Sequence, residues 1–274
     1  MAKSFTFDGI DLATYGLQVE DYSIAEMANI GFTSSAAVYG DAYFTSINHT
    51  TRSLALQCSV VAINTSALRD SMASIKSLLN PILSDKIIVL DHEPDRRYIG
   101  RMSSMSAPAV KGFNGITFAI ELECLAYTQD TDETNTAVAS ITTDPDTLTV
   151  SSVPGTASRI PAEIYVRNET GADLTATAIT IANATTNETI TWTGTLQDDR
   201  WLRFGDLDSD GRFSSSISRS NSTGSDPEAE VYSDVVSGFT SGDWVRLKGG
   251  VDNSITITGI ATGSMEVTYR GRYI

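Results

Sequence analysis

Most hydrophobic segments of this chain alternate apolar and polar residues, and this period of two constrains the fold more than any other feature. The clearest cases are RSLALQCSVVAI (52–63) and GITFAIELECLAY (115–127). Successive side chains of a β-strand point to opposite faces, so each segment predicts a half-buried strand. Cys58 and Cys124 fall on the apolar faces of these segments, and we expect both to be buried free thiols.

One segment of the first half has a helical period instead. In TSALRDSMASIKSLLN (65–80) the apolar side chains make a single stripe, which consists of Leu68, Met72, Ile75, Leu78 and Leu79. Asn64, Thr65 or Ser66 can cap its start, and Asn80-Pro81 ends it. Strands are predicted before the helix and after it, so residues 1–128 read as a mostly β, α+β domain.

The remaining segments of the first half give shorter or weaker patterns. The opening FTFDGIDLATYGLQV predicts two short strands around an Asp-Gly turn at residues 8–9. Residues 20–51 show little periodicity, and we expect a long excursion or an extended arm there. The segments KIIVLD (86–91) and RRYIGRM (96–102) predict two strands joined by a polar link.

The second half reads as an all-β domain. Residues 129–158 are rich in Thr, Ser and Asp and predict a linker, with one strand around LTVSSV. Within 159–274 every apolar segment has strand length and turn-rich flanks. This spacing predicts a β-sandwich or jelly roll, so the fold class of the whole chain is mostly β.

The charge of the chain limits its partners. Its formal net charge is −15, which argues against a protein that grips nucleic acid through phosphate contacts. An acidic wall past which nucleic acid slides remains compatible with this charge, because such a wall repels phosphates. No apolar run reaches the roughly 18 residues that a membrane span needs, and no secretory signal is evident. We therefore expect no membrane insertion and folding in a cytoplasm.

The stretch FGDLDSDGRF resembles the first half of an EF-hand calcium loop. Its three alternating carboxylates are Asp206, Asp208 and Asp210. An EF-hand also needs a bidentate acid at its twelfth position and a helix on each side, but that position is Ile217 and both flanks read as strands. We favour a hairpin with Asp210-Gly211 in its turn, with a weak cation site on the same loop as the alternative.

A second polar cluster, DHEPDRRYIGR (91–101), contains the residue types of a catalytic site. General acid–base chemistry needs groups that converge in a pocket, whereas adjacent strand residues point to opposite faces. We favour a surface turn at a subunit contact, made by Asp95, Arg96, Arg97 and Tyr98. A hydrolase that uses His92 in this cluster is the weakest alternative.

Large aromatic side chains gather in the second half, and core or interface use is their commoner role. Trp201 and Trp244 are the candidates for a surface that faces a glycan. The chain has no P-loop, no dinucleotide fingerprint, no nucleophile elbow and two histidines in all, His49 and His92. We predict no enzymatic activity and no cofactor.

The order of features in residues 52–127 resembles the N-terminal domain of the siphophage distal tail proteins, the Dit family. A strand is followed by a helix that closes with SIKSLLNP, by KIIVLDHE, by PDRRYIGRM and by a long strand. In that family the phrase like PDRRY lies where one hairpin strand passes to the next. The opening FTFDGIDLATYGLQV and the phrase VYGDAYF (38–44) are also similar to family members.

The second half resembles the galectin-like or carbohydrate-module-like sandwich that many members of this family carry. The similar phrases are WLRFGDLDSDGRF, SGDWVRLKGGVDNSITITG and the final MEVTYRGRYI. The resemblance implies a ring-forming, tail-tube-like domain over 1–128, a linker over 129–158 and a peripheral sandwich over 159–274.

The resemblance also implies a mechanical function. Such a protein is a structural virion component, assembled in the host cytoplasm as a hexameric ring at the distal end of a non-contractile tail. The ring joins the tail tube protein to the tail-tip hub of the baseplate and surrounds the DNA exit channel, with no specific DNA binding. The outer domain supports fibres, side proteins or host glycans. The alternative function is a host-glycan-binding or fibre-anchoring module.

Overall fold

The computed structural model describes most of the chain and shows a mostly β protein, as predicted. The described residues are 4–24, 30–36, 42–49, 51–80, 85–112, 114–125, 128–130, 134–208 and 213–273, with backbone alone for 30–36 and 42–49. The chain divides into two compact units, Met1–Thr131 and Asp132–Tyr273, called here the N-terminal and C-terminal units. Each unit has its own hydrophobic core.

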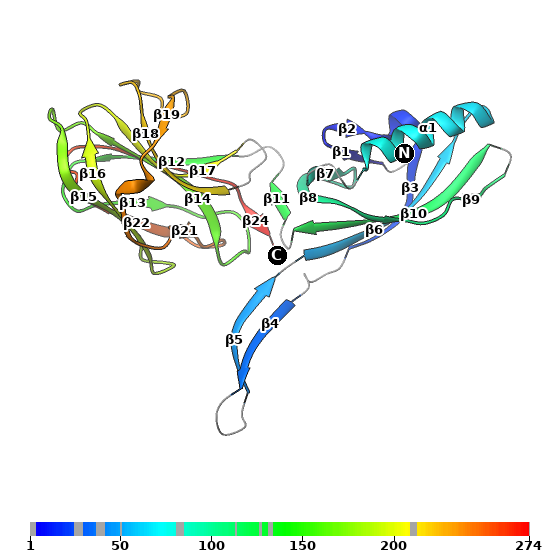
Figure 1. Ribbon diagram of the computed structural model, residues 1–274, viewed down its shortest axis with the longest axis horizontal. Helices are drawn as coiled ribbons and strands as arrows, with labels where there is room; N and C mark the ends of the chain where they lie inside the picture. The colour runs from blue at the N-terminus through cyan, green and yellow to red at the C-terminus, as the bar shows by residue number, and fades with distance from the viewer. Residues whose placement is uncertain are drawn as a thin grey trace. The chain divides into compact units, whose positions relative to one another are not determined.

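The N-terminal unit is built on one antiparallel sheet (Figure 1). The strand order is β2 (Ile10–Asp11), β1 (Phe5–Phe7), β7 (Lys86–Leu90), β8 (Glu93–Met105), β10 (Gly115–Leu125), β6 (Thr51–Val61) and β3 (Leu17–Ile24). Short strands β9 (Ala109–Val110) and β11 (Thr128–Asp130) pair with β10 and β8. In the expected arm, β4 (Ile30–Ala36) and β5 (Ala42–His49) form a separate antiparallel pair, and the rest of that arm lies partly outside the described residues.

The two alternating segments of the sequence form the centre of this sheet. β6 and β10 pair along their whole length, so that Cys58 lies opposite Phe118 and Leu56 lies opposite Ile120. These four side chains are buried in one core. Burial raises the pKa of Cys58 to about 12, and the same effect raises that of Cys124 to about 12. The prediction of buried free thiols is confirmed.

The helix α1 (Thr65–Leu78) lies where its stripe predicted it. Its N-cap is Asn64, whose Oδ1 accepts a hydrogen bond from the Ala67 amide at 2.8 Å. Within the stripe, Ile75 and Leu79 are fully buried, and the other members pack against the same core. Among the described residues, no helix has the length and apolar character needed to cross a membrane.

The opening hairpin of the N-terminal unit follows from its Asp-Gly turn. Asp8 and Gly9 have φ values of 54° and 77°, so both adopt the left-handed conformation of a tight two-residue hairpin turn. The pairing of β1 with β2 confirms the predicted strands. The short 3-10 helix η1 (Leu12–Tyr15) follows directly and contacts α1.

The C-terminal unit is a β-sandwich, as predicted. Its larger sheet runs β12 (Asn135–Ile141), β23 (Gly263–Tyr269), β14 (Ile160–Asn168), β17 (Trp201–Leu207), β18 (Phe213–Ser220) and β19 (Tyr232–Asp234), with β21 (Arg246–Leu247) beside β14. The smaller sheet runs β13 (Asp146–Val150), β22 (Asn253–Thr258), β15 (Leu174–Asn183), β16 (Glu188–Leu196) and β20 (Phe239–Gly242). The short elements η2 (Val236–Gly238) and β24 (Arg272–Tyr273) complete the unit. Apolar side chains of both sheets meet between them, such as Ile164 and Val267 against Ile181 and Ile257.

The linker expected over 129–158 is corrected by the structure. Within it, β12 pairs with β23 along its full length and β13 pairs with β22. Ile141, Leu148 and Val150 from these strands belong to the core of the sandwich. Each is an end strand of its sheet and needs one apolar face, so its Thr, Ser and Asp residues on the other face made it look like a polar linker.

Candidate functional site

The outer face of the larger sheet in the C-terminal unit carries a group of polar side chains. The strand register places Glu163 opposite Thr268 and Tyr165 opposite Arg203. Residues alternate along each strand, so the neighbours of these four side chains point into the sandwich core. The sheet itself therefore brings together groups that are far apart in sequence.

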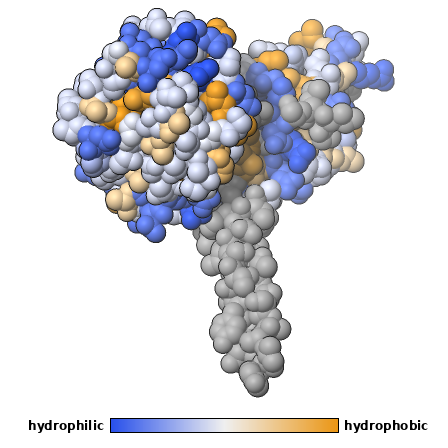
Figure 2. Space-filling model, turned by 60° about the vertical axis from the view of Figure 1, so that its left-hand side comes forward, coloured by the Kyte–Doolittle hydropathy of each residue, from blue (hydrophilic) through white to orange (hydrophobic). Residues whose placement is uncertain are grey.

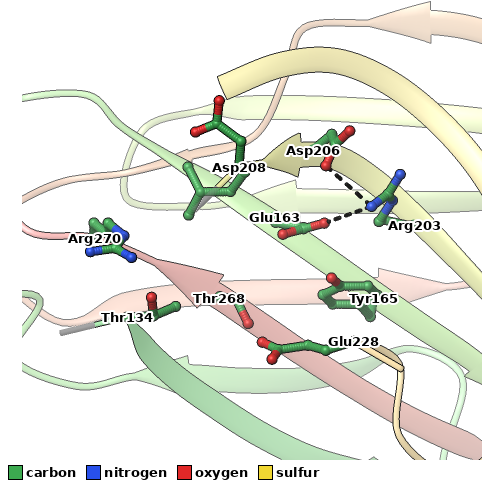
Figure 3. Close-up of a pocket in the computed structure, with 10 residues that line it drawn as sticks. Thr134, Glu163, Tyr165, Arg203, Asp206, Asp208, Glu228, Thr268 and Arg270 are labelled. Carbon is green, nitrogen blue, oxygen red and sulfur yellow. Dashed lines mark hydrogen bonds and ion pairs between the residues drawn. The ribbon is translucent and has the colours of Figure 1, made fainter. Parts of the chain in front are cut away.

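The chain between β18 and β19, residues 221–231, lies against this outer face. The Trp201 Nε1 donates to the Gly224 carbonyl at 2.9 Å, and the Tyr232 hydroxyl donates to the Pro227 carbonyl at 2.9 Å. We call residues 221–231 the covering segment. It contributes one wall of a cavity of about 300 Å³ on the sheet surface (Figure 3).

The cavity is lined mainly by charged side chains. These are the carboxylates Glu163, Asp206, Asp208 and Glu228 and the guanidinium groups of Arg203 and Arg270. Tyr165, Thr268 and Thr134 add hydroxyl groups to the lining. The composition suits a polar or charged ligand far better than an apolar one.

Arg203 holds one side of the cavity together. Its Nη1 lies 3.4 Å from Glu163 Oε1 and 3.2 Å from Asp206 Oδ1 (Figure 3). Its Nε donates to Ser218 Oγ at 3.0 Å, and its guanidinium lies 4.5 Å from the centre of the Tyr232 ring. The stacking and the hydrogen bonds fix the orientation of this cation.

Glu163 is a buried carboxyl group within this arrangement, with a side chain that is 5% exposed. Burial raises its pKa to about 6, while the Tyr165 hydroxyl and the charge of Arg203 act in the opposite direction. The free-energy cost of desolvating the carboxylate therefore exceeds the stabilisation that Tyr165 and Arg203 give it. Such perturbed carboxyl groups are common in functional sites.

The aspartate triad divides between this cavity and a part of the chain outside the described residues. Asp206 is paired with Arg203, Asp208 lines the cavity, and Asp210-Gly211 lies outside the described residues. β17 and β18 pair antiparallel, so the predicted hairpin is confirmed. Among the described residues, no three acidic, histidine or cysteine side chains are placed to hold a metal ion, and a weak cation site on this loop stays a prediction.

The two tryptophans expected to face a glycan have different environments. Trp201 is 3% exposed, with Arg167 lying over its ring and Tyr165 against it edge-on at 6.3 Å, so it presents no open face to a sugar. That expectation was wrong because the covering segment buries the ring. Trp244 is half-buried and packs edge-to-face with Phe213 at 6.0 Å, and its role remains a prediction.

The segment Asp95–Tyr98 is not a turn, which corrects the sequence interpretation. The turn is Asp91-His92, and β8 already begins at Glu93. The pairing jumps from Leu90↔Glu93 to Val89↔Arg97, so residues 94–96 form a bulge, a place where a strand tolerates proline. The sequence signal for a turn therefore marked a bulge.

Two residues of that segment are committed to their own unit. Arg97 is buried, and its Nε and Nη2 donate to Gln129 Oε1 at 3.1 and 2.9 Å. The buried Tyr98 donates its hydroxyl to Glu93 Oε2 at 2.7 Å. Asp95 and Arg96 are the members with more accessible side chains, and a subunit contact through them stays a prediction.

The cluster of Glu163, Tyr165, Arg203 and Thr268 was missed in the sequence. Their outward positions on predicted strands were the available signal, since each is flanked by apolar residues. The register between β14, β17 and β23 is what brings them together, and a single sequence does not contain that register.

Comparison with known proteins gives a result at the level of structure. No family model matches the chain, and no curated protein matches its sequence. The crystal structure of the SPP1 Dit (gp 19.1) protein, described as a paradigm of the hub adsorption apparatus in Gram-positive infecting phages, aligns over 100% of both chains with a TM-score of 0.66 and 18% identity. The chain has the fold of SPP1 Dit. The resemblance read from the sequence is thus confirmed for the fold of both units.

Two structures of the phage P2 baseplate in its activated conformation also align with the chain. The one with Ca covers 99% of this chain and 98% of that chain, with a TM-score of 0.47 and 9% identity. The one with Sr covers 98% of both chains, with a TM-score of 0.44 and 10% identity.

Proposed function

We propose that this chain is a structural protein of a siphophage tail tip, a distal tail protein that joins the tail tube to the hub of the baseplate. The observation that carries the proposal is the match to SPP1 Dit over the full length of both chains, with a TM-score of 0.66. Both units take part in that match. The proposal therefore does not rest on one common β-sheet architecture, which unrelated functions share.

The N-terminal unit supplies features that suit a ring. Its sheet is open, with β2 and β3 as the end strands along the described path. An end strand has unpaired backbone groups, and closed cyclic symmetry lets neighbouring copies cover them. In the proposed hexamer this unit forms the ring and surrounds the DNA exit channel.

The charge of the chain is consistent with such a channel. Residues 1–130, which include the unit proposed to surround the channel, carry nine Lys and Arg against fourteen Asp and Glu, and this acidic excess repels the phosphates of a passing genome and does not retain them. The partners in this arrangement are the tail tube protein on one side and the tail-tip hub protein on the other. The protein is then a virion component with a mechanical rather than an enzymatic role.

The C-terminal unit is the peripheral domain in this proposal, and its partners are side proteins, fibres or host glycans. The face that it presents in Figure 2 is mainly hydrophilic or neutral, with small separate hydrophobic spots. Such a surface suits polar recognition better than the burial of a large apolar patch. A glycan-binding role would have to use groups other than the buried Trp201.

The oligomeric state of the purified full chain tests the proposal. Mass photometry over a range of concentrations should show a hexamer of the 29.4 kDa chain, and negative-stain images should show rings with six-fold symmetry. A strict monomer at every concentration, with or without the tail tube protein, would contradict it.

A further inference from the structure

The strand β12 is an end strand of the larger sheet in the C-terminal unit, and one of its edges is open. It pairs with β23 along its full length, from Asn135↔Tyr269 to Ile141↔Gly263. Among the described residues, no other strand or loop backbone is hydrogen-bonded to its second edge. An end strand of this kind presents a row of backbone N–H and C=O groups with which another strand can pair.

The other end strands of this unit have features that hinder such pairing, and β12 has none of them. β19 has three residues and includes Asp234, β20 has four residues and a bulge against β16, and β13 begins with Asp146. β12 has seven residues, NTAVASI, with no charged residue, no proline and no bulge in its pairing. Short length, charge, proline and bulges are the usual protections of a sheet edge. β12 is therefore the end strand of this unit that is best suited to accept another strand.

The inner face of β12 indicates what an added strand would direct toward the core. Ala137 and Ala139 pack against the core of the sandwich, yet both stay partly accessible. The residues opposite them on β23, Val267 and Met265, are 0% and 1% exposed. Two small side chains thus cover the core less completely at the β12 edge. An added strand with larger apolar side chains on the same face would bury this accessible apolar surface, which is favourable in water.

The outer face of β12 indicates the charge of the added strand. Val138 is 63% exposed at the middle of the strand, and Glu266 lies opposite it on β23. Glu266 is the one charged residue of these two strands, and burial, followed by the charges of Glu228 and Asp226, raises its pKa. Two strand spacings, about 10 Å, separate Glu266 from the corresponding position of an added strand, and a long basic side chain can extend over Val138 toward it.

We propose that the open edge of β12 binds an extended segment of a partner protein, which joins the larger sheet as a strand with apolar residues facing the core and a basic residue beside Val138. Backbone hydrogen bonds would supply the affinity, and the alternate side chains the specificity. The chain after residue 130 carries ten Lys and Arg against twenty Asp and Glu, so the surrounding field attracts a basic segment. The inference concerns the C-terminal unit alone and does not depend on the proposed place in a phage tail.

Peptide binding to the full chain, followed by fluorescence anisotropy, tests this inference. The probe is a fluorescein-labelled peptide of sequence Thr-Val-Lys-Val-Thr, called the lysine peptide, whose valines would face the core. One control peptide has glutamate in place of the lysine, and another is the lysine peptide N-methylated at its two valines and its lysine, which removes backbone donors. We expect the lysine peptide to bind most tightly and the N-methylated one to lose binding. Equal binding of the N-methylated peptide, or no binding of the lysine peptide at millimolar concentration, would overturn the inference.

Hydrogen exchange measured by mass spectrometry locates the bound peptide. The amides of β12 that point away from β23 should exchange rapidly in the free chain and slowly with the lysine peptide bound, because the added strand accepts their hydrogen bonds. Exchange in β13 and β20, the end strands of the smaller sheet, should not change. Slower exchange at those strands but not at β12 would overturn the inference. Protection of β12 that rises with protein concentration without peptide would show pairing with a second copy, which would overturn the assignment to a partner protein.

Two variants separate the contributions of the edge and of the charge. Val138→Lys places a cation where the lysine of the peptide would lie and should weaken its binding about tenfold, whereas Val251→Lys, at an exposed position beyond β21, should leave binding unchanged. Both positions are exposed, so both variants should keep the Tm of the unit. Glu266→Gln should reduce the preference for the lysine peptide over the glutamate peptide. Unchanged binding in Val138→Lys would overturn the proposed edge, and an unchanged preference in Glu266→Gln would overturn the assignment of a basic residue.

Discussion

The strand β8 of the N-terminal unit and the outer face of the C-terminal sandwich both contain buried charged groups, but they satisfy them differently. On β8, Arg97 gives two hydrogen bonds to the amide oxygen of Gln129, at 2.9 and 3.1 Å. On the outer face, Arg203 approaches Glu163 at 3.4 Å, and the desolvated carboxyl keeps a pKa of about 6. The first arrangement fixes a strand in place. In the second, the partners of Glu163 do not fully offset the cost of removing its carboxylate from water.

This difference between the two sites agrees with the roles that we propose for the two units. Polar groups that are fully satisfied within the fold specify one structure. Incompletely compensated groups in a cavity are more typical of a surface that recognises something else. In the proposed function, the N-terminal unit forms the ring and the C-terminal unit is the peripheral domain that recognises other partners.

The largest expected effect comes from the core of the N-terminal unit. Ile75→Asp places a carboxylate at a position that is 0% exposed and should cost about 4 kcal/mol of unfolding free energy. Calorimetry should show loss of the N-terminal transition with the C-terminal transition retained. Ala73→Asp, on the exposed side of the same helix, is the matched control and should change stability little. Equal losses in both transitions would show that the two units are not separate folding units.

The next effect tests the charge compensation by Arg203. Arg203→Met leaves the buried Glu163 without its cation and should destabilise the C-terminal unit by about 3 kcal/mol at pH 7. The control Arg219→Met removes a guanidinium that donates to the Thr195 carbonyl and should cost less than about 1 kcal/mol. If both variants lose the same unfolding free energy, the Glu163–Arg203 contact does not contribute more to stability than an ordinary surface hydrogen bond.

A smaller effect isolates the cost of ionising Glu163. The unfolded carboxyl has a pKa near 4.5, and the folded one has a pKa of about 6. Because the folded pKa is the higher one, ionisation costs nothing well below pH 4.5 and costs its full amount above pH 6, about 2 kcal/mol. The stability of Glu163→Gln relative to the original chain should rise by about this amount between pH 4 and pH 7. A difference that does not change with pH would show that the carboxyl is not buried as described.

The features that could be predicted from the sequence are those that depend on near neighbours. The helix of residues 65–80 followed from its apolar stripe and its Asn64 cap, and β6 and β10 followed from their alternation. The sandwich followed from many short strands at turn-rich intervals.

The features that could not be predicted depend on pairings between distant segments. β12 and β13 were taken for a linker because their burial comes from β23 and β22, which lie more than a hundred residues later. The cavity was missed because Glu163, Arg203 and Thr268 meet through strand register. The burial of Trp201 could not be foreseen because it depends on the covering segment.

Cryo-electron microscopy of intact phage tails that contain this protein tests the central claim most directly. The proposed function predicts a six-fold ring of this chain at the distal end of the tail tube, with the N-terminal unit around the channel and the C-terminal unit at the periphery. Density for the chain at any other position in the particle would contradict the account.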